Sequence, residues 1–178
     1  QALARGQSAL LLTAHFTTLE IGGRFMSETH RMGGLYRDPN NPVIAHLMRG
    51  QRTRHMSPAE HFDDLRGLVR ALRGNHAIWY APDQAKRTKS SEILPFFGVP
   101  AITNTATGKI AEMTSAAVVP FFAKRESDHS YTLTLLPALE NFPTADPTAD
   151  AIRINRLIEE HVRLAPEQYF WVHKRFKA

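Results

Sequence analysis

The chain contains no cysteine in its 178 residues. This absence excludes disulfide bonds, thiolate nucleophiles and cysteine-bound zinc, so histidine and carboxylate side chains must supply any acid-base or nucleophilic chemistry. The phosphate-binding glycine loop, the dinucleotide-binding glycine motif and the paired-histidine zinc motif are missing as well. No apolar run approaches the roughly 20 residues that a membrane-spanning helix requires.

The sequence does contain enough apolar material for a real core, because 43% of the residues are hydrophobic. This length and composition predict one compact domain over residues 1–178. The formal net charge of +5 favours acidic partners, namely phosphorylated lipids, an acidic carrier protein, nucleic acid or an anionic membrane face. Charge alone does not choose among them.

The most informative segment is a short apolar run, residues 8–14, that ends at His15 and is followed five positions later by Glu20. Such a run predicts a buried strand that leads through a turn into a helix. Loops after strands are where open α/β sheets usually carry their chemistry. The segment therefore predicts an active site at a strand end.

The remaining pattern predicts alternating strands and helices. Further strands are expected over residues 31–36, 77–81, 117–122, 130–136 and 169–172, and helices over residues 20–29, 43–48, 57–74, 108–115 and 150–164. Residues 1–6 are typical of a helix end, residues 49–54 of a basic connector, and residues 95–105 of a loop. This order predicts an α/β layered domain with a mostly parallel central sheet flanked by helices.

The pair His15 and Glu20 has two interpretations. In the first, Glu20 accepts a hydrogen bond from one ring nitrogen of His15, while the other nitrogen removes a proton from an acceptor hydroxyl. In the second, Glu20 only caps the following helix by reaching back to Thr17. His55 and Glu60 share the spacing, but Glu60 fits a capping box that opens with Ser57. The residues alone leave the two interpretations of Glu20 open.

Two further groups of polar residues are candidates for binding. Tyr36, Arg37, Asn40, Arg49, Arg52 and Arg54 fall within a short stretch of the chain. Arginine binds phosphate oxygens bidentately, so the group predicts an anion site, although any one of these side chains could simply be solvated. Asp83 and Gln84 end the strand at residues 77–81, on the sheet edge expected for His15, where a turn-forming aspartate is the alternative.

Seven blocks in a fixed order carry a resemblance to a known family. They are residues 15–24 (HFTTLEIGGR), 36–41 (YRDPNN), 49–52 (RGQR), 81–84 (APDQ), 95–98 (PFFG), 119–121 (VPF) with Arg125, and 165–177 (APEQYFWVHKRFK). Together they resemble the late acyltransferases of lipid A biosynthesis, within the wider group of glycerolipid-type acyltransferases. The resemblance covers nearly the whole chain and implies a single acyltransferase catalytic domain preceded by an N-terminal membrane anchor.

The family implies transfer of a fatty acyl chain from acyl carrier protein to a hydroxyl of a Kdo-bearing lipid A precursor. The reaction would take place at the cytoplasmic face of the Gram-negative inner membrane, without a metal ion or cofactor. His15 would be the general base and Glu20 its orienting partner. The implied substrate-binding residues are Arg37, Asn40, Arg49, Arg52, Asp83 and Gln84, where the three arginines would hold either the sugar phosphates or the carrier's phosphopantetheine. The basic end near Lys174 and Arg175 is expected to meet the acidic carrier.

Two alternatives remain. An acyltransferase of the same chemistry could use a glycerolipid acceptor, and only acceptor assays separate the two. The net charge also suits a nucleic-acid-binding domain, but the arginine and aromatic residues are not interleaved on one strand as such a surface requires. We therefore expect a membrane surface and no nucleic acid among the partners.

Overall fold

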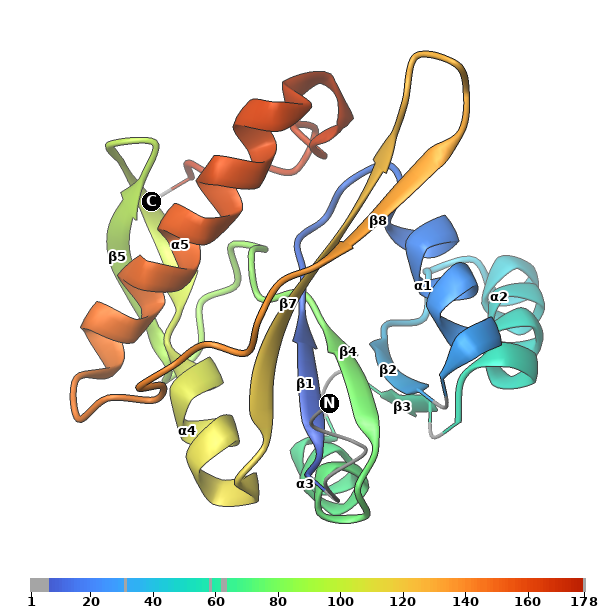
Figure 1. The fold of residues 1–178 in the computed structure, drawn as a ribbon, viewed down its shortest axis with the longest axis horizontal. Coiled ribbons are helices and arrows are strands. Elements are labelled where there is room, and N and C mark those ends of the chain that lie inside the picture. Colours follow the sequence, from blue (N-terminus) through green and yellow to red (C-terminus); the bar gives the residue numbers. More distant parts are fainter. Residues whose placement is uncertain (1–6, 31, 58, 62–63, 178) are drawn as a thin grey trace.

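The computed structural model describes residues 7–30, 32–57, 59–61 and 64–177. Its centre is a six-stranded sheet in the order β3-β2-β4-β1-β7-β8 (Figure 1). The strands are β1 (Ala9–Leu12), β2 (Met32–Tyr36), β3 (Ala59–His61), β4 (Ala77–Tyr80), β7 (Ala117–Arg125) and β8 (Tyr131–Leu135). The first five run parallel, and β8 pairs antiparallel with β7. The predicted α/β class with a mostly parallel sheet is confirmed.

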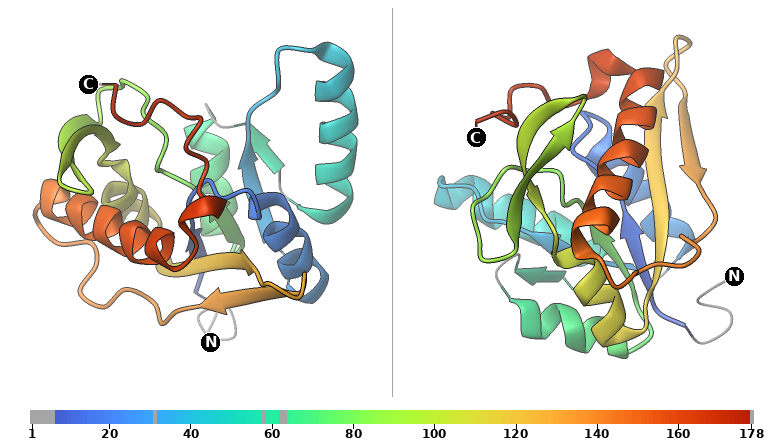
Figure 2. Two further views of the ribbon diagram at one scale, coloured as in Figure 1. Left: turned by 90° about the horizontal axis from the view of Figure 1, so that it is seen from above. Right: turned by 90° about the vertical axis from the view of Figure 1, so that its left-hand side faces the viewer.

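Helices cover both faces of this sheet. They are α1 (Leu19–Thr29), α2 (Pro42–His55), α3 (Leu65–Arg73), α4 (Ala106–Thr114) and α5 (Pro147–Leu164). Figure 2 shows α3, α4 and α5 on one side of the sheet and α1 and α2 on the other. Within the described residues, no helix has the length and apolarity needed to cross a bilayer.

The side chains of β1 explain why this strand is apolar throughout. Leu10 and Leu12 belong to the larger core, which α3, α4 and α5 complete. Ala9 and Leu11 point to the other face and pack in a second cluster with Trp79. Because successive side chains of a strand alternate between faces, a strand covered on both sides must be apolar at every position.

A hairpin replaces the loop that was expected over residues 95–105. Strands β5 (Ser91–Phe96) and β6 (Val99–Asn104) pair antiparallel in a separate two-stranded sheet. Phe97 and Gly98 form the turn, both with positive φ angles, which is the geometry that lets a two-residue turn join twisted strands. The loop was predicted because proline cannot donate to a strand ladder. In this small sheet both strands nevertheless contain a proline, and Pro95 and Pro100 stand opposite each other.

Three other predicted boundaries are wrong. The basic connector at residues 49–54 continues helix α2, which Asn41 caps by accepting from the backbone N–H groups of Val43 and Ile44. The helix expected from residue 57 begins at Leu65, where Asp64 supplies the cap, and residues 59–61 pair with β2 instead. Residues 169–172 form one isolated bridge and no strand. The expected helix end at residues 1–6 lies outside the described residues.

Two helical glycines offer a matched test of the packing between α1 and the sheet. A Cβ atom at Gly22 would lie 2.7 Å from the Cβ atom of Ala123, whereas one at Gly50 would meet nothing within 4 Å. Gly22→Ala should therefore lower the free energy of unfolding by about 1–3 kcal/mol through overpacking. Gly50→Ala should raise it by up to about 1 kcal/mol through helix propensity. Urea unfolding followed by tryptophan fluorescence measures both, and equal effects would contradict the described packing.

Candidate active site

A cavity of about 640 Å³ opens at the carboxyl ends of the parallel strands, beside His15. Its apolar wall includes Leu19, Leu35, Met56 and Trp79, and its polar lining comes from several elements. This volume lies in the range of small-molecule sites, which are mostly apolar with a few placed polar groups. The predicted position of the site at a strand end is thus matched by a cavity.

His15 is held by Asp83, the third residue after the end of β4. The ring nitrogen Nδ1 of His15 lies 2.6 Å from Oδ1 of Asp83, and the backbone N–H of His15 donates to Oδ2 at 3.0 Å. The hydroxyl of Tyr169 donates to the same Oδ2 at 3.0 Å. The strand order makes this possible, because β1 and β4 are parallel neighbours that pair Leu12 with Tyr80, so both chains leave the sheet together.

Asp83 is ionised in this arrangement. Burial alone would raise the pKa of Asp83, but the hydrogen bonds and charge of His15 together with the Tyr169 hydroxyl outweigh burial and hold the pKa below its usual range. Burial and the nearby Asp83 charge raise the pKa of Tyr169, so the phenol keeps its proton. An ionised carboxylate only accepts hydrogen bonds, so Nδ1 of His15 must donate and the neutral ring carries its lone pair on Nε2.

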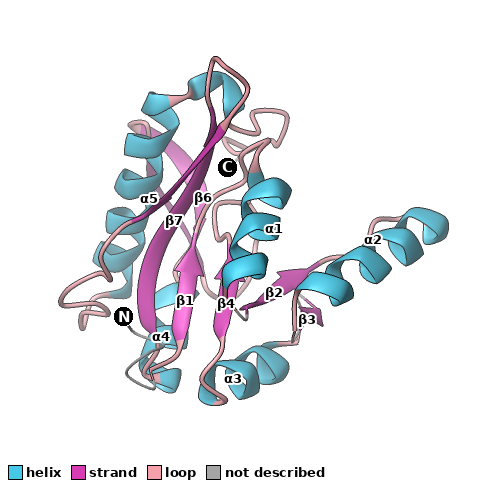
Figure 3. Cartoon of the chain, turned by 45° about the vertical axis from the view of Figure 1, so that its right-hand side comes forward, coloured by secondary structure: helices cyan, strands magenta, loops and turns pink. Residues whose placement is uncertain are grey.

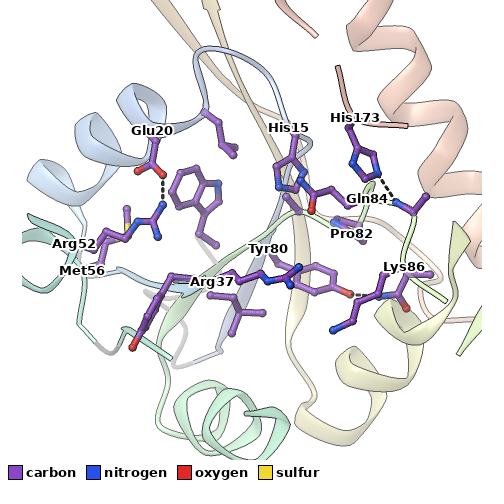
Figure 4. A pocket seen from close by; sticks show the side chains of 18 of the residues that line it. His15, Glu20, Arg37, Arg52, Met56, Tyr80, Pro82, Gln84, Lys86 and His173 are labelled. Carbon is purple, nitrogen blue, oxygen red and sulfur yellow. Dashed lines mark hydrogen bonds and ion pairs between the residues drawn. The ribbon is translucent and has the colours of Figure 1, made fainter. Parts of the chain in front are cut away.

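The predicted pairing of His15 with Glu20 is wrong. Glu20 lies in the first turn of α1 and forms an ion pair with Arg52 of α2. Figure 4 shows Glu20 and Arg52 on one side of the cavity and His15 with His173 on the other. The carboxylate that orients the ring comes from a neighbouring strand, so the pairing could not be read from spacing along the chain.

The structure brings together some of the predicted binding residues and separates others. Arg37, Arg52 and Gln84 line the cavity, and Asp83 lies behind His15. Asn40 and Arg49 are not among the lining residues, and Arg49 pairs with Asp38 at 2.6 Å on the exposed side of α2. Of the group predicted to bind an anion, Tyr36, Arg37 and Arg52 line the cavity, and Lys86 adds a further cationic side chain to its lining.

Two site residues from the C-terminal segment were not assigned roles from the sequence. Tyr169 supports Asp83, and Nε2 of His173 accepts the backbone N–H of Ala85 at 2.8 Å. Burial lowers the pKa of His173, with the charge of Asp83 acting in the opposite sense, which suits a neutral ring that accepts this bond. The prediction of a strand over residues 169–172 gave no role to Tyr169, because its bond to Asp83 joins segments that are far apart in the sequence.

Comparison with known proteins places the chain in a family. The model of the bacterial lipid A biosynthesis acyltransferases matches residues 1–178. The chain belongs to this acyltransferase family. It is 38% identical to the lipid A biosynthesis lauroyltransferase of Escherichia coli K12 and 35% identical to the palmitoleoyltransferase of the same organism, each over 99% of this chain and 58% of the relative. The myristoyltransferase of Escherichia coli K12 is 26% identical over 96% of this chain and 54% of its own.

The chain thus spans just over half the length of these curated relatives. Within the described residues, no group of three histidine, aspartate or glutamate side chains could hold a metal ion. The candidate active site of this family member therefore consists of the His15 imidazole, the buried Asp83 carboxylate and the cavity beside them.

The ionised state of Asp83 can be tested through stability. Asp83→Asn should lower the free energy of unfolding by about 2–3 kcal/mol near neutral pH, because a buried hydrogen bond to a charged group contributes roughly 1.5–3 kcal/mol. The folded-state pKa lies below the ordinary value of 3.8. The wild type is therefore more stable than Asp83→Asn above pH 3.8, and this difference in stability is lost as the pH falls through the folded-state pKa.

Urea unfolding of both proteins at successive pH values from 7 down to about 3 measures the effect. We expect the difference in unfolding free energy between wild type and Asp83→Asn to narrow at the acidic end. A difference that stays constant over this range would contradict an ionised Asp83 in the folded protein.

Proposed function

We propose that this protein transfers a fatty acyl chain from acyl carrier protein to a hydroxyl of a Kdo-bearing lipid A precursor. The observation that carries the proposal is the His15 ring, fixed by buried Asp83 at the wall of a cavity with an apolar side and two arginines. Membership of the lipid A acyltransferase family supports the reaction class. We propose the donor, the acceptor and the mechanism in addition to this reaction class.

In the proposed mechanism His15 acts as general base. Its Nε2 atom takes the proton of the acceptor hydroxyl as the hydroxyl oxygen attacks the thioester carbonyl. The tetrahedral intermediate then collapses to an ester as its C–S bond breaks, and the imidazolium gives the proton to the departing thiolate, which leaves as the free thiol. Asp83 stabilises the imidazolium and fixes the tautomer, as the carboxylate of a catalytic triad does. No nucleophile from the protein is needed, because the acceptor supplies the attacking oxygen.

Glu20 takes a different part from the one that spacing suggested. Its carboxylate fixes the guanidinium of Arg52, which is largely buried at the wall of the cavity. Arg37 also lines the cavity and is exposed. We assign Arg37 and Arg52 to the phosphate groups of the acceptor, since guanidinium groups bind phosphate oxygens bidentately. Glu20 then positions Arg52, and Gln84 adds amide donors and acceptors at the opposite wall.

We further propose that the protein binds to the surface of the cytoplasmic membrane through α2. Figure 3 shows α2 projecting from the edge of the sheet beyond β2 and β3. Three apolar side chains in its first half are exposed, Val43 at 66%, Ile44 at 47% and Leu47 at 61%. The same helix contains three arginines and no acidic residue. Exposed apolar and basic side chains on one helix are typical of binding to anionic bilayer surfaces.

The roles of His15 and Glu20 predict different kinetic defects. His15→Ala should lower kcat by about 10²–10⁴-fold, the usual contribution of a general base, while the protein stays folded. Glu20→Gln frees Arg52 and should raise KM for the acceptor more than it lowers kcat. Mass spectrometry of the products formed from acyl carrier protein and a tetra-acylated lipid A precursor measures both. Near-normal turnover by His15→Ala would refute the mechanism.

The same assay distinguishes the acceptors. A lysoglycerophospholipid offered in place of the lipid A precursor should be acylated slowly, whereas faster acylation of the glycerolipid would overturn the proposed acceptor and leave the His15 mechanism intact. This comparison addresses the alternative of a glycerolipid acyltransferase with the same chemistry.

The membrane proposal predicts a change in vesicle binding. Val43→Ser with Leu47→Ser should weaken binding to vesicles containing anionic lipid by about 10²–10³-fold, because the two changes remove about five carbon groups and each buried CH₂ group contributes ~0.8 kcal/mol. Leu65→Ser with Leu164→Ser is the matched control, since these leucines are 53% and 68% exposed on α3 and α5. Vesicle flotation measures the bound fraction. If the control pair loses vesicle binding to the same extent, α2 is not the membrane-binding surface.

A further inference from the structure

A second cavity, of about 650 Å³, lies beside the candidate active site. Ala85 and His173 line both cavities, so the two are neighbours across a shared wall. The C-terminal tail forms one side of the second cavity and the loop after β4 forms the other. Figure 2 shows the tail passing alongside this loop, and the hydrogen bond from the Ala85 N–H to Nε2 of His173 joins them. We call this second cavity the tail groove.

The tail groove is strongly basic. Arg87, Lys174 and Lys177 line it, and no aspartate or glutamate does so within the described residues. All three side chains are exposed, and none forms an ion pair inside the described part of the chain. Unpaired charges of one sign in a concave surface attract a partner of the opposite sign.

The tail that carries these lysines is firmly attached to the fold. The side chain of Arg175 is only 2% exposed, donates to the backbone oxygen of Ile102, and reaches Thr103 Oγ1 and Asn155 Oδ1 at 3.2 Å each. Its guanidinium also lies over the ring of Phe96. The expectation that Arg175 meets an acidic partner at the surface is therefore wrong, because this side chain fixes the tail and leaves Lys174 and Lys177 outside.

The groove combines its charge with exposed apolar surface. Phe170 and Val172 line it at exposures of 43% and 78%. A surface of exposed lysines, an arginine and exposed apolar side chains matches a protein partner whose acidic face also offers apolar side chains. The lipid acceptor is assigned to Arg37 and Arg52 of the active-site cavity, and Figure 4 shows Arg52 on the side away from His173.

We propose that the tail groove is the docking site for the acidic carrier protein that brings the acyl thioester. This inference rests on the proposed function, because it takes the donor to be a carrier protein. The carrier's acidic face sits against Arg87, Lys174 and Lys177, and its thioester arm passes the wall formed by Ala85 and His173 to reach His15. Donor and acceptor then approach His15 from opposite sides of the same cavity and do not compete for one opening.

The test uses charge reversal at the groove with a matched control. Lys174→Glu with Lys177→Glu changes the net charge by −4, and Arg66→Glu with Arg70→Glu makes the same change on exposed positions of α3, at the other end of the strands. Binding of acyl carrier protein is measured by calorimetry at low and high salt. Lys174→Gln with Lys177→Gln serves as a milder second variant.

We expect the groove reversal to weaken carrier binding by about tenfold or more at low salt, with the difference shrinking at high salt as the charges are screened. The glutamine pair should lose less, and the α3 pair should bind within about twofold of wild type. In acyl transfer, KM for the carrier-bound donor should rise in the groove variant, while KM for acyl-pantetheine, which lacks the carrier, should hardly change.

Two results would overturn the docking site and leave the proposed function standing. In the first, the groove variants bind the carrier as strongly as wild type. In the second, the α3 pair loses as much carrier affinity as the groove pair. Wild-type protein that neither binds the carrier nor accepts its acyl chain would overturn the donor and the groove together. If KM rises equally for the carrier-bound and carrier-free donors, Lys174 and Lys177 contribute to binding of the thioester and not of the carrier. This result would likewise overturn the docking site.

Discussion

The site depends on one buried carboxylate. Asp83 is 3% exposed and accepts three hydrogen bonds, two from His15 and one from Tyr169. These bonds connect the ends of β1 and β4 to the C-terminal segment, which are far apart in the sequence. Because burying a charge without partners is costly, the fold is stable with Asp83 ionised only when all three segments are in place. The geometry of the His15 ring is therefore a consequence of the fold as a whole.

The C-terminal segment contributes to the site through two anchors. Tyr169 pairs with Phe16 in an isolated bridge, and Phe170 donates its backbone N–H to the oxygen of His15. Further along, buried Arg175 attaches the tail to β6. Between these anchors lies His173, which holds the loop after β4. One short segment thus supports His15, Asp83 and the wall of the cavity.

How far the sequence could predict this protein depends on the range of each interaction. The strand before His15 and the helices α1, α4 and α5 follow from local periodicity, and the sheet class follows from their order. The β5–β6 hairpin is a local pairing, but it was missed because its prolines suggested a loop. The partner of His15 was missed for a different reason: Glu20 is near in sequence, whereas Asp83 is near only because β1 and β4 are adjacent in the sheet.

The separation of the two carboxylates has an electrostatic consequence for the proposed chemistry. Glu20 is half exposed and already paired with a cation, Arg52. Asp83 is buried, and within the described residues its only ion-pair partner is the His15 ring. Protonation of His15 during the reaction therefore brings a positive charge to a carboxylate that lacks a permanent one. A lysine or arginine paired with Asp83 would neutralise it in the resting protein and remove this stabilisation of the imidazolium. In the proposed mechanism, the buried carboxylate of Asp83 thus acts on His15, and the exposed carboxylate of Glu20 positions Arg52.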